Sequence, residues 1–239
     1  YTTAQGKRII ARRPIRIGSM DVSLEAPERA TAATQILVKW TGPGNNYDQI
    51  ALVPVGADEK TKALTTAAIL RHGSRVHPTA RVRTMQPDGS VKVGTFADVA
   101  RRSAQLAHAL RDCGVTGDER VATLMWNNQE HVEAYCAVPS MGAVLHTLNP
   151  RLTPEQLIYI ANHADDRVVI VDGTLAPLLA AVLPHLAGVR TVVVTGAVDL
   201  APLQRDGLTV VAYEEFIAGQ PETFDWPELD EFSAAAMCY

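Results

Sequence analysis

The stretch RVATLMWNNQEHVEAYCAVPSMGAVLHTLNPRL, residues 120–152, decides the fold class of this chain. Its first six residues form an apolar run that is typical of a buried central strand, and residues 143–148 form a second such run. Between the two runs, Asn127 can cap a helix that extends to Val138. A strand, a helix and a second strand in this order predict a crossover unit with parallel strands.

The segment after this unit carries the clearest helix start in the chain. Thr153 is placed to act as the N-cap, Pro154 takes the first helical position, and Gln156 completes a capping box. We expect this helix to end near His163, and residues 167–171 then form an apolar run that predicts the next strand. The chain therefore continues the same alternation of strand and helix.

A longer helix opens at Thr95, where Asp98 offers an imperfect capping box, and Gly114 predicts its end. Helical spacing predicts that one of its faces packs on a sheet through Val99, Ser103, Leu106 and Leu110. Further strands are predicted at residues 81–85, 90–93, 190–195 and 209–212, and further helices at residues 64–71, 175–186 (interrupted near Pro184) and 214–218. Strands repeatedly separated by helices predict an α/β fold with a largely parallel sheet covered on both faces.

Residues 1–62 differ in character from the rest and predict a small β-rich segment. Short runs with partial apolar alternation at residues 20–26, 35–40 and 49–55 are separated by turn-rich stretches. Basic residues near the N-terminus are interpreted as a solvated tail: Lys7, Arg8, Arg12, Arg13 and Arg16. We therefore expect two domains, residues 1–62 and residues 63–239. The first is compatible with a fused module, a dimerisation arm or a misjoined sequence.

The composition indicates a globular protein and argues against several function classes. The 239 residues are 47% hydrophobic, and 22 basic against 26 acidic residues give a net charge of -4. This balance offers no electrostatic footprint for nucleic acid or for an anionic membrane surface. No apolar run approaches the ~20 residues of a transmembrane segment, and no signal segment opens the chain. Three cysteines without metal-ligand spacing fit a reducing environment, so we expect a cytoplasmic protein.

The candidate catalytic groups have structural explanations. His72 and His77 are the closest pair of histidines, but they lack cysteine or carboxylate partners at ligand spacing, which argues against a zinc site. Asp165 and Asp166 stand between a predicted helix and a predicted strand, where we interpret them as solvated turn carboxylates. Glu133 lies near the start of a predicted helix, where the helix dipole favours a carboxylate. The sequence therefore predicts no catalytic residue and no metal ligand.

From residue 64 onward the chain resembles the AMP-forming fatty-acyl-CoA synthetases of the adenylate-forming superfamily. The resemblance rests on stretches that match in order, at residues 117–124, 127–135, 137–152 and 162–172. It implies the N-terminal part of the AMP-binding domain of such an enzyme. Enzymes of this family join a fatty acid to ATP, release pyrophosphate and pass the acyl-adenylate to coenzyme A.

The resemblance also implies cofactors and partners. The intact enzyme is expected to use ATP, Mg²⁺ and CoA with a medium- or long-chain fatty acid, and a homodimer is compatible with it. The Gly-rich phosphate loop and the mobile lysine-bearing domain, which neutralise the phosphoryl charge, are expected beyond Tyr239. These 239 residues alone are therefore expected to bind none of these cofactors and to be catalytically incompetent.

One loop within the chain carries a functional expectation. By analogy with related ligases, Asn149, Pro150 and Arg151 lie near the coenzyme A entrance. The alternative is that Asn149 and Pro150 only form a strand-to-helix turn. A second function also stays open, namely a non-catalytic α/β scaffold whose β-rich front segment mediates protein interactions.

Overall fold

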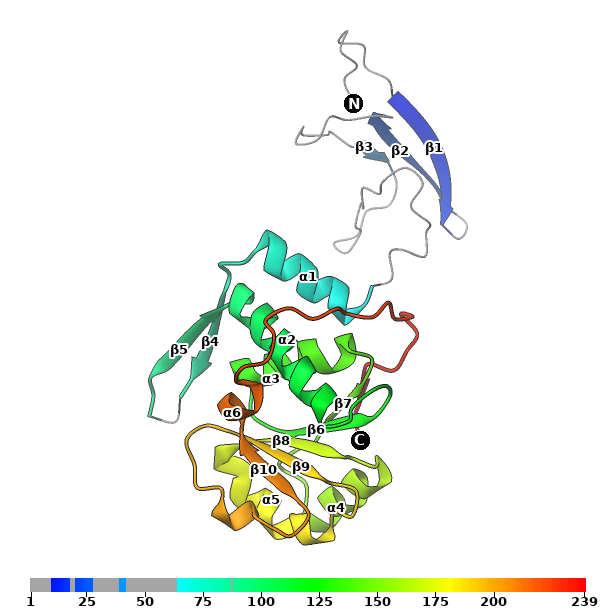
Figure 1. Cartoon of the computed structure of the whole chain (residues 1–239). Coiled ribbons are helices and arrows are strands. Elements are labelled where there is room, and N and C mark those ends of the chain that lie inside the picture. Colours follow the sequence, from blue (N-terminus) through cyan, green and yellow to red (C-terminus); the bar gives the residue numbers. More distant parts are fainter. Residues whose placement is uncertain (1–9, 18–19, 28–38, 42–63, 87) are drawn as a thin grey trace. The chain divides into compact units, whose positions relative to one another are not determined.

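The computed structural model describes residues 10–17, 20–27, 39–41, 64–86 and 88–239 (Figure 1). The chain divides into two compact units, Tyr1–Asp58 and Glu59–Tyr239. This division lies close to the boundary expected between residues 62 and 63.

The first unit contains a three-stranded antiparallel sheet in the order β1-β2-β3, with β1 at Ile10–Ile17, β2 at Met20–Pro27 and β3 at Lys39–Thr41. The strand predicted at residues 20–26 is confirmed as β2, and the one predicted at residues 35–40 overlaps β3. The strand predicted at residues 49–55 lies outside the described residues.

The interpretation of the basic residues as a tail is wrong for Arg12, Arg13 and Arg16, because all three lie within β1. The antiparallel register places Arg12 opposite Glu25 and Arg16 opposite Asp21. Lys7 and Arg8 lie outside the described residues.

The second unit contains a six-stranded sheet in the order β10-β9-β8-β6-β7-β11, in which every pairing is parallel. Its strands are β6 (Arg120–Leu124), β7 (Val144–Thr147), β8 (Val168–Asp172), β9 (Thr191–Thr195), β10 (Thr209–Ala212) and β11 (Ala236–Met237). A separate antiparallel hairpin is formed by β4 (Arg81–Met85) and β5 (Val91–Thr95). The predicted α/β class with a largely parallel sheet is confirmed, whereas the sequence pattern did not indicate β11.

The helices connect these strands. They are α1 (Thr66–Val76), α2 (Phe96–Asp112), α3 (Gln129–Ser140), α4 (Pro154–His163), α5 (Ala176–Val182) and α6 (Tyr213–Ile217), with short 3-10 turns η2 (Gly173–Leu175), η3 (Leu183–His185) and η4 (Ala201–Leu203). Both predicted capping boxes form, at Thr95 with Asp98 and at Thr153 with Gln156. The cap of α3 is Asn128 rather than Asn127, since the Asn128 side chain accepts from the His131 amide.

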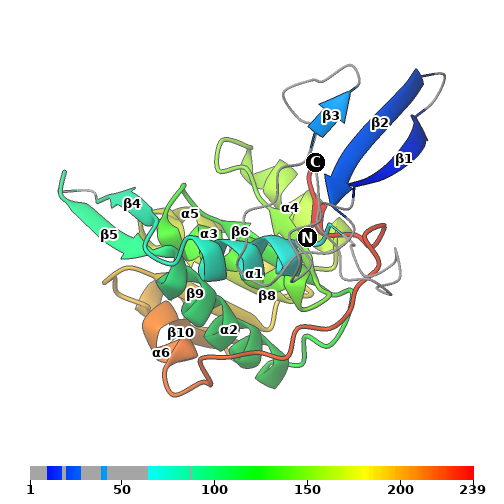
Figure 2. The same cartoon turned by 90° about the horizontal axis from the view of Figure 1, so that it is seen from above.

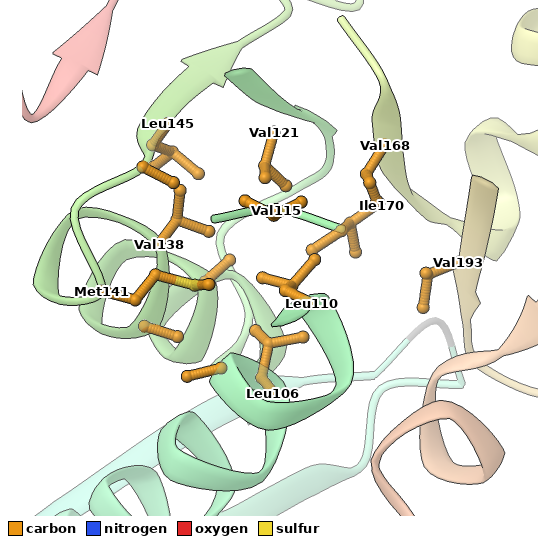
Figure 3. Packing of buried hydrophobic residues seen from close by; sticks show 14 of the residues in the cluster. Leu106, Leu110, Val115, Val121, Val138, Met141, Leu145, Val168, Ile170 and Val193 are labelled. Carbon is orange, nitrogen blue, oxygen red and sulfur yellow. The ribbon is translucent and has the colours of Figure 1, made fainter. Parts of the chain in front are cut away.

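Two hydrophobic cores lie on the two faces of the sheet. The first core, formed with α2, α3 and α6, contains Val168 and Ile170 of β8, and the second, formed with α4 and α5, contains Val169 and Val171. Figure 3 shows the first core, and in Figure 2 α1 and α2 lie in front of the strands. Each fully buried aliphatic side chain contributes roughly 1.5–3 kcal/mol, so alternate burial fixes the position of β8 between both layers.

Three helices of this unit are followed by a residue in the left-handed backbone conformation. Gly114 after α2 and Gly142 after α3 have positive φ angles of 85° and 92°, a conformation that favours glycine. Asp165 takes this place after α4 with φ 56°, and the amide of Asp166 donates to the carbonyl of Ala161 at 3.1 Å. The predicted end of the long helix at Gly114 is therefore confirmed.

We predict that Gly114→Ala lowers the free energy of unfolding by about 1–2 kcal/mol, because an L-residue is strained in the left-handed region. Apart from the two flanking residues, no residue has an atom within 4 Å of the added Cβ, so the variant measures backbone strain rather than a steric clash. Urea unfolding followed by the helical circular dichroism signal gives the value. Gly117→Ala is the matched control, because its φ is not positive and its Cβ would meet Glu119 at an ordinary 3.9 Å. Equal stability of both variants would contradict the prediction.

Candidate functional site

The order of the strands creates a topological switch point between β6 and β8. These two strands are neighbours in the sheet, yet α3, which follows β6, packs into the first core, whereas α5, which follows β8, packs into the second. The chain therefore leaves the carboxyl ends of β6 and β8 in opposite directions (Figure 1). In open α/β sheets, ligands bind outside the carboxyl ends of the strands at such a point.

Polar side chains bridge the switch point. Asn128 donates from Nδ2 to Asp172 Oδ2 at 3.1 Å, and the indole N–H of Trp126 donates to Thr174 Oγ1 at 2.9 Å. Thr174 in turn donates to Asp172 Oδ1 at 2.6 Å. The Trp126 side chain nevertheless remains 47% exposed, so an aromatic surface is accessible at this edge. Local sequence patterns do not indicate these contacts, because the paired residues lie more than forty positions apart along the chain.

The loop expected near a coenzyme A entrance lies at the same edge, directly after β7. The amide of Arg151 donates to Asn149 Oδ1 at 3.0 Å, which closes a tight turn before the cap of α4. Asn149 and Arg151 are exposed, and Pro150 is half-buried. The turn interpretation is thus correct for the backbone, and it leaves the Arg151 side chain accessible to a ligand. A role for this loop in binding coenzyme A stays a prediction.

Glu133 is the centre of a buried polar network that joins α2, α3 and α6. Its Oε1 accepts from Arg102 Nε at 2.7 Å and from Gln129 Nε2 at 2.8 Å, while its Oε2 accepts from the Tyr213 hydroxyl at 2.8 Å. Arg102 also donates twice to Glu214, both times at 2.8 Å. The helix-dipole explanation for Glu133 is therefore incomplete, because partners on three helices hold this carboxylate in the core.

In this network, burial disfavours the charged forms of Glu133 and Arg102, whereas their hydrogen bonds and ion pairs favour these forms. Burial raises the pKa of Glu133 against the opposite effect of Arg102, and burial also raises the pKa of Tyr213. For Arg102, burial acts to lower the pKa, but the bonds to Glu214 and Glu133 outweigh it and the pKa is raised. Since the Glu133 side chain is 0% exposed and both of its oxygens accept bonds, it cannot reach a substrate. Its role is structural.

Asp166 is also buried, and the prediction that it is a solvated turn residue is wrong. Both of its carboxylate oxygens lie within 2.9 Å of His146 Nδ1, and both side chains are 0% exposed. Burial raises the pKa of Asp166, although the contact with His146 opposes this shift. Asp165 does match the prediction, because its side chain is 55% exposed.

The described residues contain neither a cluster of metal ligands nor, at Cys136, a thiol that is reactive at neutral pH. Among them, no group of three or more His, Cys, Asp or Glu side chains could hold a metal. His72 and His77 are neighbours, with ring centroids 6.1 Å apart. Burial raises the pKa of Cys136 to about 11, so this half-buried thiol stays protonated at neutral pH. Among the helices of the described residues, none has the length and apolar character to cross a membrane.

Known proteins similar to this chain share an activity class. The family described as AMP-binding enzyme matches residues 70–239. A 3-methylmercaptopropionyl-CoA ligase of Ruegeria pomeroyi is 42% identical over 177 residues, which cover 74% of this chain and 32% of that ligase. A medium-chain-fatty-acid–CoA ligase of Ectopseudomonas oleovorans is 37% identical over 177 residues, with the same coverage of 74% and 32%.

A solved structure adds a likeness in fold. The anthranilate CoA ligase AuaEII in complex with anthranoyl-AMP has a TM-score of 0.61 at 24% identity, over 72% of this chain and 31% of that chain. This likeness supports the α/β assignment alone. The chain spans about a third of the length of the curated relatives it matches.

We predict that Glu133→Gln lowers the free energy of unfolding by about 1–3 kcal/mol, because Arg102 loses its buried carboxylate partner and keeps only the exposed Glu214. The measurement is urea unfolding of the 239-residue chain. Glu228→Gln, an exposed position with the same chemical change, should leave stability nearly unchanged.

A double variant, Arg102→Met with Glu133→Leu, should recover much of the loss, since it removes both charges together. A Glu133→Gln variant as stable as the Glu228→Gln control would show that the network contributes nothing.

Proposed function

Because this chain belongs to the AMP-binding enzyme family, we propose that it is the N-terminal portion of an ATP-dependent acyl-CoA ligase. The reaction joins a medium- or long-chain fatty acid to coenzyme A through an acyl-adenylate and releases AMP and pyrophosphate. The observation that carries the proposal is the identity of 42% and 37% to two CoA ligases over three quarters of the chain. One of these relatives is named for medium-chain fatty acids and the other for 3-methylmercaptopropionate, whose chain contains a thioether sulfur, so we infer an acid with an unbranched chain as the substrate class.

In this reaction, the role of the described residues is to hold binding groups in fixed positions. They do not neutralise the charge of the phosphoryl group that reacts. The parallel sheet holds the loops at its carboxyl edge, where Trp126 offers an aromatic face and Arg151 a guanidinium group. Adenylation requires donors that neutralise phosphoryl charge, together with Mg²⁺. In the part of the chain that the structure describes, no side-chain cluster fits a metal ion, so we assign no Mg²⁺ ligand to it.

Coenzyme A is the partner that the carboxyl edge suits best. Its phosphate groups are recognised well by arginine, whose planar guanidinium donates two parallel hydrogen bonds. Arg151 is exposed, and the Asn149 turn fixes its backbone. We therefore assign the loop Asn149–Arg151 to the coenzyme A entrance.

A second candidate function concerns the first unit. Residues 1–58 form their own compact unit and lie outside the family match at residues 70–239. This separation favours an added interaction module, through which the chain would bind a protein partner or a second copy of itself. If the second unit is a non-catalytic scaffold, this module is the functional part.

A chimera distinguishes the two functions. Residues 63–239 replace the corresponding segment of the Ectopseudomonas oleovorans medium-chain-fatty-acid–CoA ligase, and the product is assayed with octanoate, ATP and CoA. We expect acyl-CoA formation by the chimera, and no ATP–pyrophosphate exchange above background by the 239-residue chain alone. A chimera that folds, as judged by circular dichroism, but forms no acyl-adenylate would favour the non-catalytic scaffold. Exchange by the chain alone would contradict its expected incompetence.

In the active chimera, Arg151→Gln should raise the KM for CoA about tenfold, because a charge-assisted bond to phosphate contributes about 1.5–3 kcal/mol. The KM values for ATP and octanoate should stay unchanged. Arg83→Gln on β4 serves as the matched control, because Arg83 is an exposed arginine on a different element. A parallel rise in all three KM values would instead indicate that the loop is only a structural turn.

A further inference from the structure

One face of the hairpin β4–β5 is open to solvent, and the strand register identifies its residues. Arg83 faces Val93 and Met85 faces Val91, so these four side chains lie on one side of the hairpin. Arg81 shares this side, because it precedes Arg83 by two positions on the same strand. We call these five residues the open hairpin face. The hairpin itself projects from the edge of the second unit (Figure 1 and Figure 2).

The other side of the hairpin is attached to α3. Thr84 is buried there, and its hydroxyl accepts from the amide of Gln129 at 3.0 Å. Lys92, which faces Thr84 in the register, donates to Glu130 at 2.7 Å. Because α3 occupies this side, the open hairpin face is turned away from the helix.

The aliphatic side chains of the open hairpin face are accessible to a partner. Met85 is 75% exposed, Val91 is 47% exposed and Val93 is 51% exposed. Single exposed apolar residues are common on protein surfaces, whereas apolar residues that lie side by side mark interaction surfaces. The register places these three side chains together at the end of the hairpin that carries the turn.

The charges on the open hairpin face select an acidic partner. Residues 64–86 contain four arginines and neither aspartate nor glutamate. Arg81 and Arg83 are exposed, and within the described residues neither forms an ion pair. Asp88 lies in the turn, next to the aliphatic end of the face. The acidic groups of a partner are therefore expected at the arginine end, and its apolar group near the turn.

The chain itself contains a segment with these properties. Residues 221–232 include five carboxylates and no basic residue. Leu229 packs toward the body of the unit, since its Cδ2 lies 3.3 Å from the position that a Cβ on Gly142 would take. Glu228 and Asp230, on either side of Leu229, are exposed, and Phe232 is 89% exposed. We call residues 228–232 the acidic segment.

The spacing of the charges matches between the two surfaces. Arg81 and Arg83 stand two residues apart on a strand, which separates them by about 7 Å. Glu228 and Asp230 are also two residues apart, and they alternate with the packed Leu229 as in an extended chain. Each arginine can therefore meet one carboxylate in a charge-assisted hydrogen bond, while the exposed aromatic ring that follows reaches the aliphatic end of the face.

We propose that the open hairpin face of one copy of this chain binds the acidic segment of a second copy. A two-fold axis makes the contact occur twice, which closes the assembly as a dimer. The dimer is weak and sensitive to salt, because its ion pairs lie at the surface. This inference goes beyond the proposed ligase function, since the contact involves neither a substrate nor the loop assigned to coenzyme A.

Sedimentation velocity of the 239-residue chain tests the proposal. The chain should show a monomer–dimer equilibrium whose Kd rises at least about tenfold from low to high salt. Arg81→Glu with Arg83→Glu should abolish the dimer, because carboxylates then face carboxylates. Arg71→Glu with Arg75→Glu is the matched control. It makes the same charge change at exposed positions of α1 and should leave the Kd within about twofold of that of the unaltered chain.

A mixture of two charge-reversed chains gives the decisive result. Glu228→Arg with Asp230→Arg should also abolish the dimer when it is tested alone. Mixed with the Arg81→Glu, Arg83→Glu chain, it should form a heterodimer, because both contacts then pair opposite charges. An unfolded variant could not regain binding in this way, so the result does not depend on the stability of either variant alone.

Three outcomes would overturn the proposal. The first is a mixture of the two reversed chains that stays monomeric. The second is a dimer that neither reversal affects. The third is an unaltered chain that stays monomeric but binds vesicles containing phosphatidylglycerol, which would assign the open hairpin face to an anionic membrane. None of them would contradict the proposed ligase function, which the chimera tests separately.

Discussion

The burial of a parallel sheet on both faces is the constraint on which the rest of this structure depends. Alternate residues of β6, β8 and β9 enter different cores, so a shift of one residue would exchange the two sets of side chains. The helices α2, α3 and α6 are needed on one face, and α4 and α5 on the other. This arrangement fixes the edges of the sheet, and it places the loop Asn149–Arg151 at the carboxyl edge.

Buried charges make the same packing specific. Glu133 is sequestered by Arg102, Gln129 and Tyr213, and Asp166 is paired with His146. Each of these carboxylates would destabilise the core without its partners, since a buried charge must be compensated. They therefore connect the helices to one another and the strand β7 to the end of α4. Neither carboxylate is available for catalysis, which agrees with a platform whose accessible groups lie at the edges of the sheet.

The local signals in the sequence predicted the elements well, and the long-range contacts much less so. The Thr153 capping box and the Gly114 stop depend on residues within one helical turn, and both form as predicted. The pairing of Glu133 with Tyr213 spans 80 positions, and that of Asp166 with His146 spans 20. No spacing rule connects such residues. For this reason the local sequence pattern favours a solvated turn at Asp166 and does not indicate the Trp126–Thr174 contact at the switch point.

The sequence by itself determined the α/β class, the order of strands and helices, and the relationship to AMP-binding enzymes, because periodicity, caps and ordered motifs are properties of contiguous residues. Only the tertiary structure decided the strand order, the switch point between β6 and β8, and the choice of Asn128 as the cap of α3. It alone brought Arg102 and Tyr213 to the carboxylate of Glu133. The physical reason is that strand pairing and burial join segments far apart in the chain, and their partners are chosen by the packing of the whole sheet.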